Sequence, residues 1–464
     1  MTLAFQDPAV NGIFTVRPDR PLDSLFSASM IRPLLAAAGL LLFLAPGSAA
    51  QDPIVRVRLL GGPVGAPELT AEAGAATITT AEGESVMLAS GEDGTARARR
   101  GSVTLLGLSS RQIDVQGVRI RIQHGRTDRV YTGRLVLKAV DGKVQLVNHV
   151  AMHEYLASVT ASEYPFREIE GVKAQAVLAR TYALRRQGAK PDYDLDDHQG
   201  SQVYKGTEIV TDVTREAVAL TAGVVLTYRG ELAEAFYSSS SGGYTAANES
   251  VWTGGAPIPY LRAVPDPYDA QAPDHRWTQT VAVGDVHGAL SRRYGGSVRG
   301  FEVTRRGPSG RVVEVRLDGA SRATISGSQF RSALNARLGW RTMRSTHFEA
   351  RRQGSDYVFD GRGFGHGVGM SQYGARGAAR AGLGFAEILA HYFPGTSVSG
   401  GEPGGAAAPS VASTAPAPQP RRTAPTPRAQ APSAPRYAPP QRRTRPTPRH
   451  EARAQSAPSR RRAW

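Results

Sequence analysis

The chain contains no cysteine. Disulfide bonds are therefore excluded as a source of stability, whichever compartment the protein occupies. Zinc sites built from thiolates are excluded for the same reason. About 350 residues lie between the N-terminal segment and the basic tail described below, which is enough for one large domain or two small ones. We expect a hydrophobic core to supply the stability.

Several catalytic and nucleotide-binding motifs are missing as well. The glycine-rich residues 361–369 do not form G-x-G-x-x-G, because no glycine stands at the sixth position, and the Walker phosphate loop is absent. Four serines follow one another at 238–241, but no G-x-S-x-G elbow surrounds them. We therefore expect a turn, or hydroxyl donors for a sugar, ahead of covalent catalysis at these serines.

The N-terminal residues predict export. Residues 1–29 show no usable apolar periodicity, whereas Met30 begins a pattern of one arginine, an apolar run from Leu34 to Ala45, and small residues before Gln51. This pattern is typical of a signal peptide, and the run is too short to span a bilayer with ease. An uncleaved anchor helix or an over-long gene model is the alternative. We expect translation to start at Met30 and the protein to reach the periplasm or cell envelope.

The C-terminal residues have a different composition. Residues 401–464 contain 14 Pro and 12 Arg, no Lys, and only Glu402 and Glu451 as acids, so they carry +10 of the total net charge of +16. Such a segment cannot bury enough apolar surface to fold. It is suited to binding anionic envelope polymers or lipid headgroups, or it is a passive solvated tail. Nucleic acid is not expected, because few aromatic residues are present for base stacking.

Between these ends, the pattern predicts an α+β fold of mixed strands and helices without regular β-α alternation. Period-two alternation predicts strands at 54–59, 118–122 and 135–137. Helices are expected at 151–187, 214–222, 286–294, 328–338 and 385–392, and further strands at 301–304, 312–317 and 357–369. The expected segments are an N-terminal extension with signal peptide (1–50), a strand-rich part (51–150), a catalytic core (151–398) and a disordered tail (399–464).

Glu163 is the strongest candidate for a catalytic group. It stands two residues before Pro165, and an expected helix with apolar residues at Val172, Ala176 and Ala179 follows it. An acid held at a rigid turn is a common way of presenting a proton donor to a substrate. The alternative role is a charge that favours the dipole of the following helix. Glu154 is the second candidate acid.

Three blocks of sequence resemble motifs of the SpoIID/LytB family of cell-wall proteins. The first contains Glu154-Tyr155-Leu156, Glu163-Tyr164-Pro165 and the run from Lys173 to Tyr182. The second is GSQVYKG at 200–206, and the third is GRGFGHGVGMSQYG at 361–374. The blocks occur in the family's order, and the resemblance covers roughly residues 52–396. On these motifs the chain is identified as a member of the family.

The resemblance implies a lytic transglycosylase that acts on peptidoglycan glycan strands without a cofactor. In this reaction one carboxylate, here Glu163, protonates the glycosidic oxygen and then accepts a proton from the muramic C-6 hydroxyl, which closes an anhydro ring. Amidase enhancers of the same family imply the alternative of a non-catalytic wall-binding protein with a cell-wall amidase as partner. A third possibility is a structural envelope protein held by its tail. The expected substrate-binding residues are Tyr164, Arg180, Gln202, Tyr204, Ser239, His366, Ser371 and Gln372.

The glycines at 361–369 fall at every second position. In a strand this spacing leaves one face without side chains and allows close approach of a sugar ring or another backbone. Tight packing without a ligand is the alternative. His366 is expected to line the site because it belongs to the third block.

The acidic segment 192–198 is expected to be a polar loop. Some members of the family are thought to hold zinc near this position through Cys and His, but Ser201 stands where the cysteine would be. No metal site is predicted, because soft ligands are missing.

Overall fold

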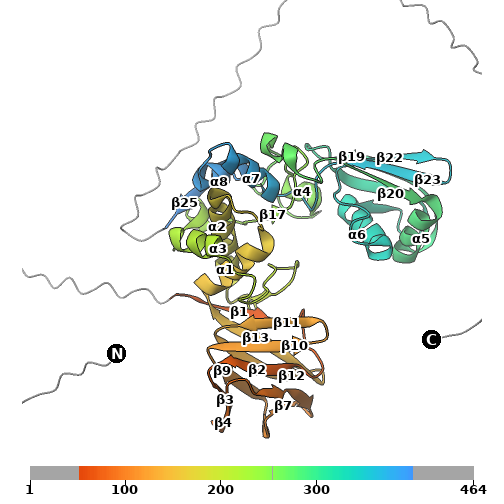
Figure 1. Cartoon of the computed structure of the whole chain (residues 1–464). Coiled ribbons are helices and arrows are strands. Elements are labelled where there is room, and N and C mark those ends of the chain that lie inside the picture. The colour runs from red at the N-terminus through yellow and green to blue at the C-terminus, as the bar shows by residue number, and fades with distance from the viewer. Residues whose placement is uncertain (1–51, 253, 401–464) are drawn as a thin grey trace, which may run out of the picture. The chain divides into compact units, whose positions relative to one another are not determined.

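The computed structural model describes residues 52–252 and 254–400. The predicted signal peptide and residues 401–464 of the predicted tail lie outside these residues, whereas Ser399, where the tail was predicted to begin, ends the last described strand. The fold is α+β, as predicted, with many antiparallel strands and eight α-helices in the described part (Figure 1). Within the same residues, no helix combines the length and apolar character that crossing a membrane requires.

The first hundred described residues form a body made of strands alone (Figure 1). Its strands are β1 (Ile54–Arg58), β2 (Glu68–Ala73), β3 (Ala76–Thr80), β4 (Ser85–Leu88), β5 (Asp93–Thr95), β6 (Arg97–Arg99), β7 (Ser102–Leu105), β8 (Leu108–Ser110), β9 (Gln112–Gln116), β10 (Arg119–His124), β11 (Thr127–Tyr131), β12 (Arg134–Val140) and β13 (Lys143–Ala151). The strands predicted from alternation are confirmed as β1, β10 and β12. Alternate residues are buried in β1 and β10, whereas β12 buries the consecutive residues Leu135, Val136 and Leu137.

A seven-stranded sheet joins this body to the helices that follow. Its order is β14-β1-β13-β12-β9-β3-β4, and β14 (Leu195–Asp196) pairs with β1 in parallel. The other elements of this region are α1 (Met152–Glu163), α2 (Ile169–Arg186), α3 (Asp212–Leu220), β15 (Val225–Tyr228), β16 (Glu231–Leu232), β17 (Tyr237–Ser238), α4 (Asn248–Val251), the 3₁₀ helix η1 (Pro267–Gln271), β24 (Met370–Ser371), α7 (Gln372–Arg380), α8 (Phe385–Tyr392) and β25 (Ser397–Ser399).

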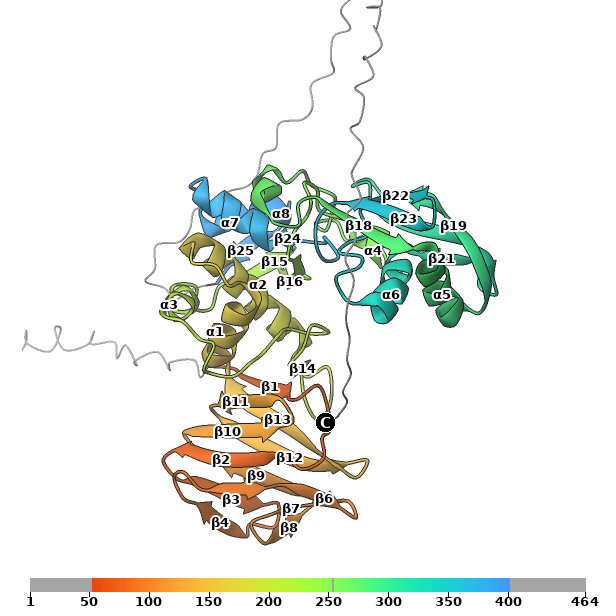
Figure 2. The ribbon, with the colours of Figure 1, turned by 45° about the vertical axis from the view of Figure 1, so that its right-hand side comes forward.

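Residues 151–187 form two helices rather than one, with a break at residues 164–168. The second helix, α2, contacts α1, α3, α7 and α8 (Figure 2). Val172, Ala176 and Ala179 are buried as predicted, but Gln175, Arg180 and other residues of α2 are buried too. The helix is therefore enclosed on most sides instead of burying a single stripe.

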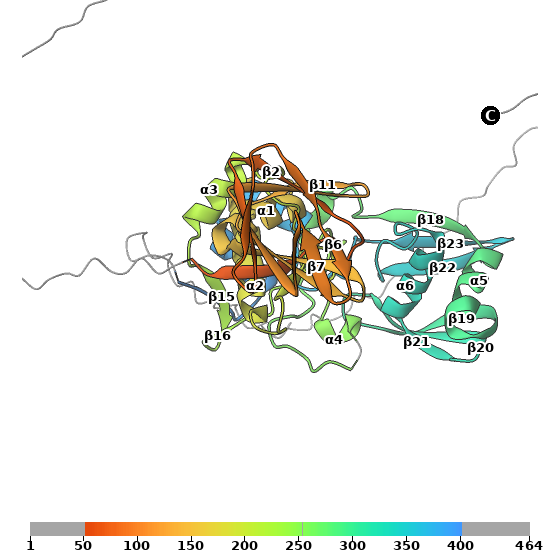
Figure 3. The same ribbon diagram turned by 90° about the horizontal axis from the view of Figure 1, so that it is seen from below.

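Residues 277–361, called the insert below, have their own hydrophobic core. Its elements are β18 (Trp277–Ala282), α5 (Val283–Tyr294), β19 (Gly296–Arg306), β20 (Val312–Ala320), β21 (Thr324–Ser326), α6 (Gly327–Leu338), β22 (Phe348–Gln353) and β23 (Asp356–Gly361). The two helices lie side by side against its strands (Figures 1 and 3). Phe330, Phe348 and Phe359 pack at the centre of this core.

The glycine block does not form the predicted strand. The last strand of the insert, β23, ends at Gly361, and Gly363, Gly365, Gly367 and Gly369 all have positive φ. Alternating left-handed residues make a loop, so the prediction of one bare strand face was wrong. The expected close approach of another backbone is confirmed, because a Cβ at Gly369 would overlap the carbonyl of Phe236.

We expect Gly367→Ala to lower the free energy of unfolding by about 2 kcal/mol or more. Its φ is +79°, and the new Cβ would overlap the guanidinium of Arg311, which is fully buried and donates to the carbonyl of Ser241. Gly382→Ala is the matched control, since φ is +90° there but no atom lies within 4 Å of the new Cβ. Chemical denaturation compares the two, and equal losses would contradict the role given to Arg311.

Candidate active site

A cleft of about 1080 Å³ lies beside the end of α1. Its walls come from α1, the loop that follows β14, the segment around β17, the glycine loop, the start of α7, and α6 of the insert. The lining includes Ser162, Glu163, Tyr182, Gln199, Ser201, Lys205, Phe236, Tyr237, Ser239, Trp252, Arg331, Asn335, Trp340, Phe364, His366 and Gln372. Hydroxyl, amide and aromatic groups dominate this set, which suits a polar ligand with flat apolar faces.

Glu163 is the last residue of α1 and the only carboxylate among the described residues that line the cleft. Two segments distant in sequence hold it. The backbone N–H of Val203 donates to Glu163 Oε1 at 2.7 Å, and Gln372 Nε2 donates to the Glu163 carbonyl oxygen at 2.7 Å. The three sequence blocks of the family resemblance therefore meet at this residue.

The surroundings of Glu163 favour its protonated form. Burial raises the pKa of its carboxyl, while the hydrogen bond from Val203 and the charge of Lys205 oppose the rise. The carboxyl also lies at the C-terminal end of α1, where the helix dipole disfavours a negative charge. A carboxyl group that keeps its proton closer to neutral pH can act as a general acid.

The alternative role for Glu163, a charge at the start of the next helix, does not fit its position. The acids at the start of α2 are Glu168 and Glu170, and Glu168 pairs with Arg376 and Arg380. The second candidate acid, Glu154, accepts a hydrogen bond from Thr132 and lines a different pocket. Glu163 is thus the acid that the cleft presents.

Three predicted substrate-binding residues also line the cleft: Ser239, His366 and Gln372. The ring of His366 lies 5.4 Å from that of Trp252, centroid to centroid. Its Nδ1 accepts the backbone N–H of Val368, and burial together with Arg311 and Arg331 lowers the pKa of His366 to about 4. The imidazole is therefore neutral near neutral pH and contributes a ring surface rather than an acidic proton.

Tyr164 and Arg180 do not reach the cleft, which corrects their predicted role. The ring of Tyr164 is fully buried and packs edge-on against Phe166 at 4.8 Å. The guanidinium of Arg180 donates to the carbonyl oxygen of Val218, near the end of α3, and to that of Val224, which follows α3. Both side chains stabilise the packing of helices behind Glu163.

Gln202, Tyr204 and Ser371 are likewise buried instead of contacting the cleft. Gln202 accepts from Tyr155 Oη at 2.9 Å and donates to Tyr237 Oη at 3.2 Å, so it supports a tyrosine of the cleft wall. The hydroxyl of Tyr204 donates to Asn148 Oδ1. Ser371 caps α7 by accepting the N–H of Gly374. A sequence motif contains two kinds of residue, those that line the cleft and those that hold the lining residues in place, and the motif alone does not tell them apart.

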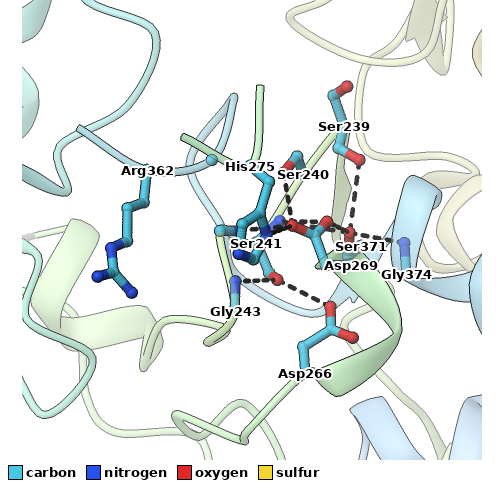
Figure 4. Close-up of polar contacts among 12 residues, drawn as sticks. Ser239, Ser240, Ser241, Gly243, Asp266, Asp269, His275, Arg362, Ser371 and Gly374 are labelled. Carbon is cyan, nitrogen blue, oxygen red and sulfur yellow. Dashed lines mark hydrogen bonds and ion pairs between the residues drawn. The ribbon is translucent and has the colours of Figure 1, made fainter. Parts of the chain in front are cut away.

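The serine run forms a turn around one buried carboxylate, Asp269 of η1 (Figure 4). Its oxygens accept five hydrogen bonds, from Ser240 Oγ, Ser241 N, Gly242 N, Ser371 Oγ and His275 Nδ1. In a nucleophilic triad the histidine lies between the serine and the acid. Here the Ser240 hydroxyl donates to Asp269 directly and not to His275, so the three residues do not form such a triad. Its role is to join the serine turn to the start of α7.

A second buried acid, Asp266, accepts from Ser241 Oγ at 2.8 Å and from Tyr392 Oη at 3.0 Å. Burial, and then the nearby Asp269, raise the pKa of Asp266 to about 6. Neither aspartate was identified from the sequence. A cluster of serines followed by two aspartates about 25 residues later was the available signal, since buried hydroxyls need acceptors.

The acidic segment is only in part the expected polar loop, because Leu195–Asp196 form β14 and the buried Asp194, Asp196 and Asp197 anchor the segment to β1. Asp194 pairs with Arg56, Asp196 pairs with Arg58, and Asp197 accepts the backbone N–H groups of Leu60 and Gly61. Among the described residues, no group of three or more His, Asp or Glu side chains has the arrangement of a metal site.

The cleft residues that the sequence analysis did not predict include Lys205, Trp252, Arg331 and Trp340. Lys205 lies inside the GSQVYKG block, which was a usable signal. Trp252 and Trp340 remain 39% and 63% exposed. Nothing in their local sequence distinguishes them from core tryptophans, because exposure depends on which elements pack nearby.

A family model matches the part of the chain that holds the first two blocks. Residues 140–228 match the model of the SpoIID family, described as Stage II sporulation protein, and residues 265–369 match a domain of unknown function, DUF8618. The second match contains the whole insert.

Curated relatives extend the similarity over much of the chain. Stage II sporulation protein D of Bacillus subtilis is 34% identical over 273 residues, which cover 55% of this chain and 76% of that protein. An uncharacterized protein of Brachyspira hyodysenteriae is 30% identical over 63% of this chain and 80% of its own length. The amidase enhancer of B. subtilis is 29% identical over 53% of this chain and 40% of its own length. On this similarity, the chain belongs to the SpoIID family.

Proposed function

We propose that this protein is a lytic transglycosylase that cleaves the bond between N-acetylmuramic acid and N-acetylglucosamine in peptidoglycan glycan strands. Membership of the SpoIID family supports a role in the cell wall. The observation that carries the finer assignment is that Glu163, whose pKa is raised, is the one carboxylate that residues 52–252 and 254–400 bring to the cleft. Hydrolytic glycosidases normally use a pair of carboxylates, so a lone acid fits a reaction without a water nucleophile.

In the proposed reaction, protonated Glu163 donates its proton to the glycosidic oxygen as the bond to the muramic C-1 breaks. The muramic C-6 hydroxyl then forms a bond to C-1, and the Glu163 carboxylate accepts the proton of that hydroxyl. The products are a 1,6-anhydro-muramic end and a free glucosamine hydroxyl, and Glu163 is again protonated. The N–H of Val203 and the charge of Lys205 favour the carboxylate between the two steps.

The direct test is mass spectrometry of glycan strands, intact and stripped of peptide, after incubation with the full chain. Anhydro-muramic ends support the proposal. Their absence from both substrates, together with binding, would instead favour the second candidate, a non-catalytic wall-binding protein that assists a cell-wall amidase. The similarity to the amidase enhancer of B. subtilis is the observation behind that candidate. Either function requires export, which residues 30–51 predict.

The rate of anhydro-end release is expected to fall as pH rises through the pKa of Glu163, because the general acid must carry a proton. The contribution of Glu163 to the free energy of unfolding is expected to fall with rising pH as well. A carboxyl whose pKa is higher in the folded state contributes stability that is complete below its unfolded pKa and is lost as pH rises through the folded pKa. Glu163→Gln should remove this component, so melting curves of variant and wild type over this pH range check the environment of Glu163 independently of activity.

A further inference from the structure

The cleft is cationic apart from Glu163. Its other charged lining residues are Lys205 and Arg331, and His366 is neutral near neutral pH. When Glu163 carries its proton, the described part of the lining therefore has two positive charges and no negative one. A cleft lined by one sign of charge attracts ligands of the opposite sign.

Arg331 has an unusual environment for an arginine. It lies on α6 of the insert, and its Nε donates to the carbonyl oxygen of Met343 at 2.9 Å. Burial lowers its pKa, yet no carboxylate within residues 52–252 and 254–400 forms an ion pair with it. The nearby acid Asp274 is already paired with Arg341 and Arg344. A partly buried cation without a counter-ion is costly for stability, which points to a ligand that supplies the charge.

The bond through Nε leaves the outer edge of the Arg331 guanidinium, formed by Nη1 and Nη2, without a hydrogen bond to the described residues. Two parallel N–H groups match the two oxygens of a carboxylate. Behind this wall, Arg311 is fully buried, and its Nε and Nη1 have no partner among the same residues. The field of Arg311 adds to the attraction for an anion.

An aromatic surface lies on the same wall. Trp340 is 63% exposed, and its ring lies 5.6 Å from that of Phe364. Asn335 holds this loop by donating to the carbonyl oxygens of Trp340 and Met343. A held, exposed indole in a polar cleft provides an apolar face for a sugar ring.

We propose that the insert forms a carboxylate subsite, in which Arg331 binds a carboxylate carried by the glycan strand and Trp340 stacks on the adjoining sugar. The choice of a glycan strand rests on the proposed function. Two sources of the carboxylate share this chemistry: the lactyl group of a muramic residue without a peptide, and an acid of an attached stem peptide.

The test measures binding by calorimetry in the full chain carrying Glu163→Gln, so that turnover does not intervene. The probes are a peptide-free glycan strand and a peptide-bearing strand, each as the free acid and with its carboxylates converted to methyl esters. We expect the acid to bind at least about tenfold more tightly than the ester, as for a charge-assisted hydrogen-bonded pair. Arg331→Gln should abolish this difference. Arg337→Gln, on the same helix but outside the cleft, should preserve it.

Two further variants keep the result interpretable. Arg331→Lys retains the charge without the paired N–H groups and should give an intermediate preference, and Trp340→Ala should weaken acid and ester equally. An Arg331-dependent preference on the peptide-free strand identifies the lactyl group, and one on the peptide-bearing strand alone identifies the stem peptide. Equal binding of acid and ester on both strands, by folded protein with Arg331 intact, would overturn the subsite.

Failure of the subsite and failure of the proposed function give different results. If the wild-type chain releases no anhydro ends but shows the Arg331-dependent preference, the subsite stands in a binding protein. If it releases anhydro ends and shows no preference, catalysis stands and the subsite is rejected.

Discussion

Glu163→Gln is expected to stop the release of anhydro-muramic ends while the chain stays folded and still binds glycan strands. Glutamine keeps the size of the side chain, and its amide oxygen can still accept the N–H of Val203, which lies 2.7 Å from Glu163 Oε1. It has no transferable proton, so both proton steps fail. We expect a loss on the order of a hundredfold or more, as for removal of a positioned general acid.

The matched control is Glu154→Gln, the same change at the other candidate acid. Glu154 lines a separate pocket and accepts a hydrogen bond from Thr132, so its amide variant should retain activity. Product analysis by mass spectrometry and a binding assay are run on all three proteins. Equal release by wild type and Glu163→Gln would assign the acid elsewhere, and loss in the Glu154 variant alone would exchange the two roles.

Asp269→Ala is expected to cause the largest loss of stability. Five donors converge on this buried carboxylate, and the substitution removes it from all of them. Within the described residues, only Ser241 N and Ser371 Oγ keep a second, longer contact, at 3.3 and 3.4 Å. Each unsatisfied buried donor costs about 1–3 kcal/mol, with some recovered by relaxation or entry of water, so we expect a total of about 3–5 kcal/mol. That loss is comparable to the stability of many domains.

The consequence should extend to the cleft. Asp269 joins the serine turn, which carries Ser239, to Ser371, which precedes Gln372 at the start of α7. Chemical denaturation measures the stability, and glycan binding of the remaining folded protein measures the geometry of the cleft. Asp318→Ala, which removes an exposed pair with Arg299, is the control and should resemble wild type. A stable Asp269→Ala protein would show that the network is dispensable.

Local pattern was sufficient for elements whose partners are close in sequence. The helix expected at 385–392 is α8, with the same bounds, and the helices expected at 286–294 and 328–338 are α5 and α6 with small extensions. Amphipathic periodicity is a local property, and these helices each bury one face. The strand predicted for the glycine block was wrong because its conformation depends on residues distant in sequence. Glycine at every second position is compatible with a strand and with alternating left-handed turns, and only the close approach of Ser238–Gly242 and Arg311 selects the turns.

For the candidate site too, some features follow from the sequence and others from the tertiary structure. The sequence determined the α+β class, the acid Glu163 with its proline-limited turn, and the order of the three blocks. The tertiary structure decided which block residues face the cleft, and it placed Tyr164, Arg180, Gln202, Tyr204 and Ser371 behind it. It also decided the chemistry of Glu163, because the raised pKa comes from burial by segments 40 and 209 residues away, and desolvation depends on what packs in space rather than on neighbours in the chain.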